Sequence, residues 1–83
     1  MSALESLDAR GLLCPLPVIR AQDRIRRLEP GEELEVTATD PGTMQDIPAW
    51  CRVHGHELLV AEQREDDPGE GRIYRFRIRV GDS

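Results

Sequence analysis

The stretch Gly-Leu-Leu-Cys-Pro-Leu-Pro-Val-Ile at residues 11–19 decides the fold of this chain, because it places a single cysteine directly before a predicted helix. Behind it, apolar side chains recur every three or four residues up to about Leu28, which is typical of one face of an α-helix. Pro15 suits the first helical position, where the N–H that proline lacks would have no partner. A residue before proline adopts extended backbone, as an N-cap residue does, so the pattern predicts Cys14 as the N-cap of this helix.

The Cys14 thiol is the main candidate for chemistry. At a helix N-terminus, unpaired N–H groups and the helix dipole favour negative charge, so this position predicts a lowered thiol pKa and a reactive thiolate. The alternative is a small buried apolar residue, as free cysteine often is, but the flanking prolines favour the reactive interpretation. Cys51 is expected in the middle of a second helix, on the same side as Ile47 and Trp50, where core packing is the better interpretation. No disulfide between the two cysteines is predicted.

The rest of the chain predicts four strands and a second helix. The strands are expected at residues 4–9, 33–39, 57–65 and 72–80. The second and fourth strands alternate between apolar and polar side chains, which is typical of strands with one face in water. The third is expected to carry Leu58 and Val60 on one face.

The second helix is expected to begin after Asp46 as its N-cap, with Pro48 in its first turn. It is expected to end at Gly55, because glycine readily adopts the left-handed conformation that closes many helices. An acidic turn is expected at residues 66–71.

This element order, β-α-β-α-β-β, predicts a two-layer α/β sandwich of the α+β class within a single domain spanning residues 1–83. A mixed four-stranded sheet carries both helices on one face, because strand-helix-strand units cross over with one hand. Acidic side chains face outward on the second strand and arginines on the fourth. Opposite charges on neighbouring strands contribute about 0.2–1 kcal/mol per pair, so the two strands are expected to be neighbours, in the order 1-2-4-3.

Composition excludes several classes of function. All eleven basic residues are arginine, so neither a Schiff-base lysine nor a P-loop lysine is available. A net charge of −5 argues against a general nucleic-acid binder, whose affinity comes from neutralising phosphates. The chain shows no apolar run of membrane-spanning length and no signal-peptide pattern. Two cysteines do not make a disulfide framework, so a cytoplasmic protein with reduced thiols is expected.

The histidines do not indicate a metal site. His54 and His56 flank a helix-ending glycine, and their spacing relative to the cysteines matches no zinc pattern. Packing or capping is the better interpretation for both side chains. Neither a metal nor a cofactor is predicted.

Several segments together resemble one protein family. The sequence CPLP at residues 14–17 follows LDARGL at residues 7–12 and resembles the CPxP signature of the TusA family of small sulfur carriers, also called SirA-like. The resemblance continues downstream through DPGT at 40–43, DIP at 46–48, Cys51 and GHEL at 55–58, and it covers residues 7–80.

The resemblance implies a function for Cys14. It implies a sulfurtransferase that accepts sulfane sulfur as a persulfide on Cys14 and relays it from protein to protein. The implied donor is a cysteine desulfurase or a rhodanese-like protein, and the implied acceptor is a downstream sulfur-relay protein. The family's destinations include tRNA thiolation, molybdenum-cofactor pathways and sulfur oxidation.

The motif and its surroundings are expected to contact these partners. The contact residues expected from the sequence are Pro15, Leu16, Pro17, Arg20, Arg24 and Arg27. The three arginines recur on one side of the helix and could dock an acidic partner, although a merely solvated face is the alternative.

Two other classes of function remain open. A regulatory or RNA-contacting module on the same fold would need a basic surface rather than a thiol, and direct nucleic-acid contact is not expected here. A thiol-redox protein would need a nearby second thiol, and Cys51 is poorly placed to supply it.

Overall fold

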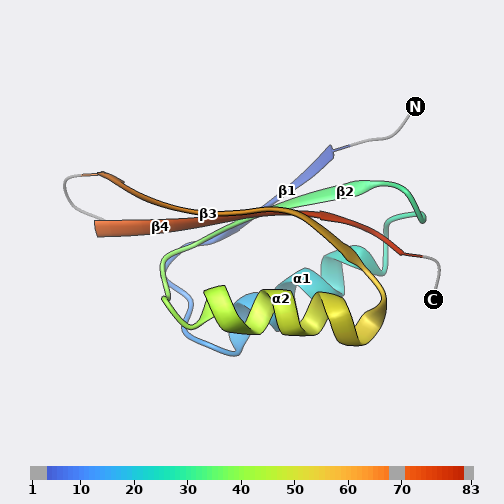
Figure 1. Ribbon diagram of the computed structural model, residues 1–83, viewed down its shortest axis with the longest axis horizontal. Helices are drawn as coiled ribbons and strands as arrows, with labels where there is room; N and C mark the ends of the chain where they lie inside the picture. The colour runs from blue at the N-terminus through green and yellow to red at the C-terminus, as the bar shows by residue number, and fades with distance from the viewer. Residues whose placement is uncertain (1–3, 68–70, 82–83) are drawn as a thin grey trace.

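The computed structural model describes residues 4–67 and 71–81 and has the predicted element order (Figure 1). The elements are β1 (Leu4–Ala9), α1 (Leu16–Ile25), β2 (Glu33–Ala38), α2 (Thr43–His54), β3 (Glu57–Asp67) and β4 (Gly71–Arg79). The sheet order is β1-β2-β4-β3, with β1 and β2 parallel and the other two pairs antiparallel. Both the β-α-β-α-β-β layout and the 1-2-4-3 order are therefore confirmed. Residues 68–70 of the expected acidic turn lie outside the described ranges.

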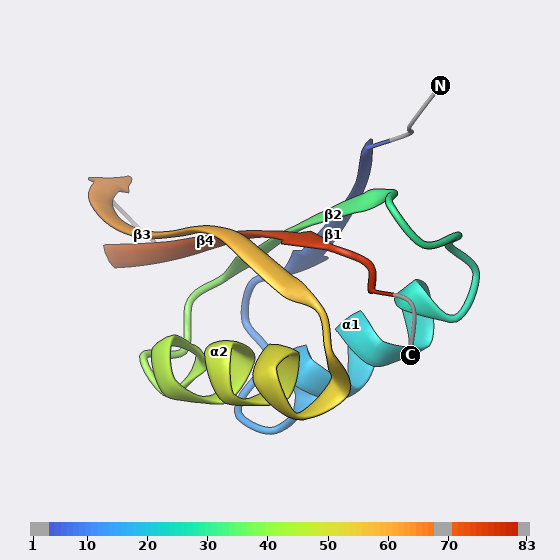
Figure 2. The same cartoon turned by 45° about the vertical axis from the view of Figure 1, so that its right-hand side comes forward.

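The two helices lie side by side against one face of the sheet, as Figures 1 and 2 show from two directions. Apolar side chains from the two central strands fill the space between the layers, and Leu34, Val36, Phe76 and Ile78 are fully buried. Burial of such a side chain contributes about 1.5–3 kcal/mol to folding. The helix layer adds Ile47 and other apolar side chains to this core. Neither helix of the described part is long and apolar enough to cross a membrane.

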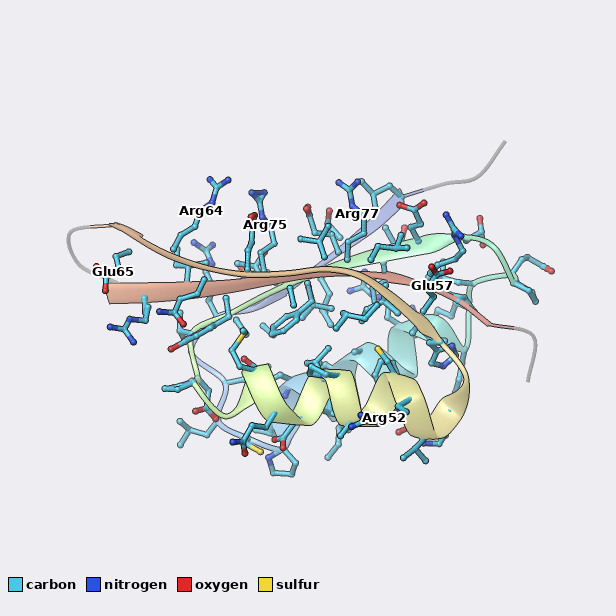
Figure 3. The ribbon with its side chains drawn as sticks, viewed as in Figure 1. Arg52, Glu57, Arg64, Glu65, Arg75 and Arg77 are labelled. Carbon is cyan, nitrogen blue, oxygen red and sulfur yellow. The ribbon has the colours of Figure 1, made fainter. Side chains whose placement is uncertain are left out.

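The opposite face of the sheet carries paired charges (Figure 3). The guanidinium of Arg77 lies 3.9 Å from Glu33 and 3.8 Å from Glu35. That of Arg75 lies 3.4 Å from Glu62 and 3.8 Å from Glu35. These contacts confirm the reasoning that placed the second and fourth strands together. These pairs are partly exposed and longer than ideal, so each stabilises the fold by no more than about 1 kcal/mol.

Strand β3 differs from the sequence prediction at a bulge. The pairing register with β4 shifts between Leu58 and Val60, so that Leu58 lies opposite Ile78 and Val60 lies opposite Arg77. A bulge inserts one extra residue, which reverses the faces of the residues that follow it. Leu58 therefore packs against the core, whereas Val60 lies with Arg77 on the open face, and the expectation that both share one face is wrong.

Helix α1 begins later than predicted. Its first residue is Leu16, and Pro15 rather than Cys14 occupies the N-cap position. The reason is a turn that precedes the helix, in which the N–H of Leu16 donates to the carbonyl of Leu13 at 2.8 Å. The α-helix also ends at Ile25, and the chain continues to Leu28 through tighter i→i+3 bonds.

Helix α2 begins earlier than predicted. The Asp40 carbonyl accepts bonds from the N–H and the hydroxyl of Thr43, at 3.1 and 2.7 Å, and these bonds start the helix three residues before Asp46. Asp46 is therefore not the N-cap, and Pro48 lies inside the helix rather than in its first turn. The predicted end is confirmed, because Gly55 adopts the left-handed conformation, with φ of 76°.

Candidate functional site

Cys14 lies exposed in the loop between β1 and α1, beside the start of α2. A Cβ atom built on Gly42 would stand 3.6 Å from the Cβ of Cys14, so the two loops are in contact. Figure 1 shows the loop before α1 passing close to the start of α2. The cysteine is thus placed by two segments that are far apart in the sequence.

Asp40 joins the two loops through its carboxylate. Its Oδ2 accepts a bond from the backbone N–H of Cys14 at 2.6 Å, and its Oδ1 accepts one from the N–H of Gly42 at 3.2 Å. Nearby, the hydroxyl oxygen of Thr39 accepts a bond from the N–H of Gly11 at 2.9 Å. The turn after β2 therefore fixes the backbone on which the thiol is carried.

Asp46 contacts the thiol itself. The Sγ of Cys14 donates a hydrogen bond to Oδ2 of Asp46, which lies in the first turns of α2. This bond raises the pKa of the Cys14 thiol above its ordinary value, with smaller contributions from desolvation and from the negative charges of Asp46 and Asp40. The predicted lowering of this pKa is therefore wrong.

The physical reason for this difference is that the Cys14 thiol lies beside carboxylates and not beside unpaired N–H groups. A cysteine at the N-cap would meet unpaired N–H groups, but the Leu16 N–H already has a carbonyl partner and α1 has no side-chain cap bond. Two carboxylates stand nearby instead, and negative charges disfavour the thiolate. At neutral pH the thiol is held in its protonated form.

The two motif prolines have different surroundings. Pro17 is fully buried at the second position of α1, whereas Pro15 is exposed. Around the cysteine, Leu13, Leu16 and Ile19 are exposed by 71%, 42% and 51%. Exposed apolar side chains concentrated within residues 13–19 suit contact with another protein.

The three arginines of the expected docking face do come together. Arg20, Arg24 and Arg27 line one shallow cavity of about 150 Å³ with Leu7 and Asp23. Their partners differ, however. Arg24 donates to the carboxylate of Glu5 at 3.0 Å and to the carbonyl of Ser6 at 3.1 Å.

Arg24 therefore attaches α1 to β1. Because the helix starts at Leu16, Arg20 is the arginine of this set that lies within about a turn of the motif. Arg27 lies beyond the last residue of the helix.

Cys51 occupies the core, as the sequence indicated. It is 2% exposed, and burial raises the pKa of its thiol to about 11. Both cysteines are free thiols. Cys51 is thus placed for packing rather than for exchange with a partner.

The histidine pair belongs to an aromatic cluster at the other end of α2. The rings of Trp50 and His56 are centred 5.1 Å apart, and Nδ1 of His56 accepts a bond from the N–H of Gly81 at 3.0 Å. Burial and the neighbouring His54 lower the pKa of His56. Within residues 4–67 and 71–81, no group of three or more His, Cys, Asp or Glu side chains is arranged so that it could hold a metal ion.

The sequence prediction did not assign Asp40 or Asp46 to the site. The sequence predicts Asp46 as the N-cap of the second helix, and Asp40 enters only as part of the DPGT segment of the family resemblance. Both aspartates lie in the downstream segments that carry the family resemblance, and this is the feature of the sequence that could have pointed to them as site residues. Which side chain contacts the thiol depends on the packing of α2 beside the loop before α1, which spacing along the chain does not reveal.

Comparisons with known proteins show the family to which the chain is similar. The family model described as "Sulfurtransferase TusA" matches residues 5–80. Two relatives from Bacillus subtilis (strain 168) align over 81 residues, or 98% of this chain. "Putative sulfur carrier protein YrkI" is 43% identical and is covered over its full length. "Putative sulfur carrier protein YrkF" is 42% identical, and this chain spans 40% of its length.

A solved structure shows the same fold. The crystal structure of a SirA-like protein from Desulfitobacterium hafniense superposes with a TM-score of 0.71 at 27% identity, covering 96% of this chain and 100% of that one. Because the family model matches residues 5–80 and YrkI, at 43% identity, is covered over its full length, the chain belongs to the TusA family.

Proposed function

We propose that this protein is a sulfur carrier that accepts sulfane sulfur as a persulfide on Cys14 and passes it to another protein. The observation that carries the proposal is the Cys14 thiol, which lies exposed in the CPxP loop in hydrogen-bond contact with Asp46. The thiolate is the form of cysteine that attacks sulfur, and a contacting carboxylate is a base that can receive the proton. Family membership supports the same reading.

The surroundings of the thiol support transfer between proteins. An exposed sulfur with apolar side chains around it can enter a partner's site and leave again. The donor would be a cysteine desulfurase or a rhodanese-like protein, and the acceptor a sulfur-relay protein of a tRNA thiolation, molybdenum-cofactor or sulfur-oxidation pathway. The reaction is that of a sulfurtransferase with a cysteine persulfide intermediate, working in the cytoplasm.

The open face of the sheet offers little support for the RNA-contacting alternative. Arg75 and Arg77 lie within 4 Å of glutamates on neighbouring strands. Phosphate contact would require these pairs to separate, which removes much of the attraction.

Intact-mass spectrometry tests the proposal. The protein is incubated with a cysteine desulfurase, its cofactor and cysteine, and the mass is read before and after reduction. We expect the wild type to gain one reducible sulfur, Cys14→Ser to gain none, and Cys51→Ser to keep most of the gain. The matched pair separates the exposed thiol from the buried one. Loading of Cys14→Ser at the wild-type level would overturn the proposal.

A further inference from the structure

The two carboxylates near the thiol are used differently. Both oxygens of Asp40 are occupied by backbone N–H groups, those of Cys14 and Gly42. Asp46 accepts its side-chain bond from the Cys14 thiol, and in the described ranges its carboxylate has no other hydrogen-bond partner. Asp46 is therefore the acid whose carboxylate contacts the sulfur and still has capacity to take up a proton.

Sulfur exchange between two thiols requires a proton to move. The net reaction converts a Cys14 persulfide and an acceptor thiol into a Cys14 thiol and an acceptor persulfide. The acceptor thiol must lose its proton before it attacks, and the sulfur of Cys14 must gain one when it leaves. A base in contact with Sγ of Cys14 can do both.

We propose that Asp46 is the proton relay for sulfur transfer at Cys14, an inference that rests on the proposed function. The Asp46 carboxylate takes the proton of the acceptor thiol, and the resulting thiolate attacks the terminal sulfur of the Cys14 persulfide. The new S–S bond forms as the bond to Sγ of Cys14 breaks, and the electron pair leaves on Sγ. Asp46 then returns the proton to Sγ, and loading follows the same steps in reverse.

The electrostatics of the site make such a relay useful. The charged groups acting on the thiol are Asp46, from α2, and Asp40, from the turn before it, and both are acidic. They disfavour a bare thiolate on Cys14, so a departing Sγ that was not protonated would be poorly stabilised. A proton held on Asp46 removes this difficulty at the moment of transfer.

The variant Asp46→Asn separates the relay from simple electrostatics. Asparagine keeps the size of aspartate and an oxygen that can accept the thiol bond, but it does not take up a proton at neutral pH. Two rates are measured on the full chain. One is alkylation of Cys14 by iodoacetamide, and the other is sulfur exchange between Cys14 and glutathione persulfide, a probe that needs no protein docking.

We expect the two rates to change in opposite directions. Alkylation at neutral pH should become several-fold faster, because loss of the carboxylate increases the thiolate fraction and the leaving iodide needs no proton. Sulfur exchange should become at least roughly tenfold slower in both directions, because positioned acid–base catalysis contributes about 10²–10⁴-fold and the larger thiolate fraction offsets only part of it.

Two further variants complete the test. Glu57→Gln removes the same charge beyond the C-terminal end of α2 (Figure 3) and should change neither rate. About 12 Å of helix separates Asp46 from the last residue of α2, His54. Asp46→Ser removes the carboxylate in a different way and replaces Asp46→Asn if circular dichroism shows that variant to be unfolded. For either Asp46 variant, the ratio of exchange rate to alkylation rate is the readout.

The outcomes distinguish the two proposals. If wild-type Cys14 takes no sulfur from the probe or from a desulfurase, the proposed function fails and the relay fails with it. If the wild type is loaded but folded Asp46→Asn exchanges sulfur at the wild-type rate or faster, the relay alone is overturned. A parallel change in both rates also overturns it, because that is the result of a purely electrostatic or positioning role.

Discussion

The Asp40 carboxylate stabilises the fold and also holds the backbone that carries the Cys14 thiol. Its removal should therefore lower the free energy of unfolding and loosen the position of the thiol. Asp40→Ala deletes a short charge-assisted bond to the Cys14 N–H at 2.6 Å and a longer one to the Gly42 N–H at 3.2 Å. Such bonds contribute about 1.5–3 and about 0.5–1.5 kcal/mol respectively. Because Asp40 is half-buried, water replaces part of this, and we expect a loss of about 2 kcal/mol in the free energy of unfolding. For a domain of this size that lowers Tm by roughly 8–16 °C.

Asp40→Asn should recover little of the loss. Both carboxylate oxygens accept N–H bonds, so an amide NH₂ in either place would face another donor. Urea unfolding followed by circular dichroism measures the stability of both variants. Glu57→Ala is the control, since it removes an exposed pair with Arg79 at 3.1 Å and should cost less than about 1 kcal/mol. A loss below about 0.5 kcal/mol in both Asp40 variants would refute the claim that this carboxylate holds the two loops together.

Two further predictions concern surface charges. If Arg20 docks an acidic partner, Arg20→Glu should slow association with the sulfur donor at low salt and flatten the salt dependence of the association rate. Arg24→Glu should instead destabilise the fold, because it places a like charge beside Glu5. Unchanged association kinetics for Arg20→Glu would show that this arginine is merely solvated. The second prediction concerns Asp8, whose pKa the hydrogen bonds from Arg10 lower from 3.8 to about 2. The stability it contributes should be present above pH 3.8 and lost as the pH falls toward 2, by less than about 1 kcal/mol because the pair is exposed. A pH titration of unfolding in Asp8→Asn that matches the wild type would contradict this.

The layout of the fold follows from local patterns that tertiary packing does not override. Strand alternation, the turn glycines and the facing charges of Glu35 and Arg77 each depend on short segments, and they sufficed for the element order and the sheet order. The bulge after Leu58 was not visible, because an extra residue in a strand leaves the alternation readable in either frame. Helix starts were misplaced where a neighbouring turn supplied the first bonds, as the Asp40 carbonyl does for Thr43.

The site shows the same division. An exposed Cys14 before a proline-started helix and a buried Cys51 could both be predicted, because helical position decides them. The charge around Cys14 could not, because it comes from α2 rather than from the thiol's own helix. The helix that follows Cys14, considered alone, predicts a lowered pKa for its thiol. In the structure the side chain of Asp46, which belongs to α2, raises that pKa instead.

A raised pKa of the Cys14 thiol suits a sulfur carrier, which encounters many molecules in solution and should react only with a few of them. Oxidation and alkylation depend on the thiolate, so an exposed thiol held protonated by Asp46 is protected while no partner is bound. When the thiolate does form, its intrinsic nucleophilicity is greater, because nucleophilicity rises with pKa. A partner that brings a cationic group beside Asp46 and Asp40 would offset their charge and lower the pKa of Cys14 in the complex. The acidic surroundings of the cysteine would then make its thiol more reactive in a docked complex than in the free protein.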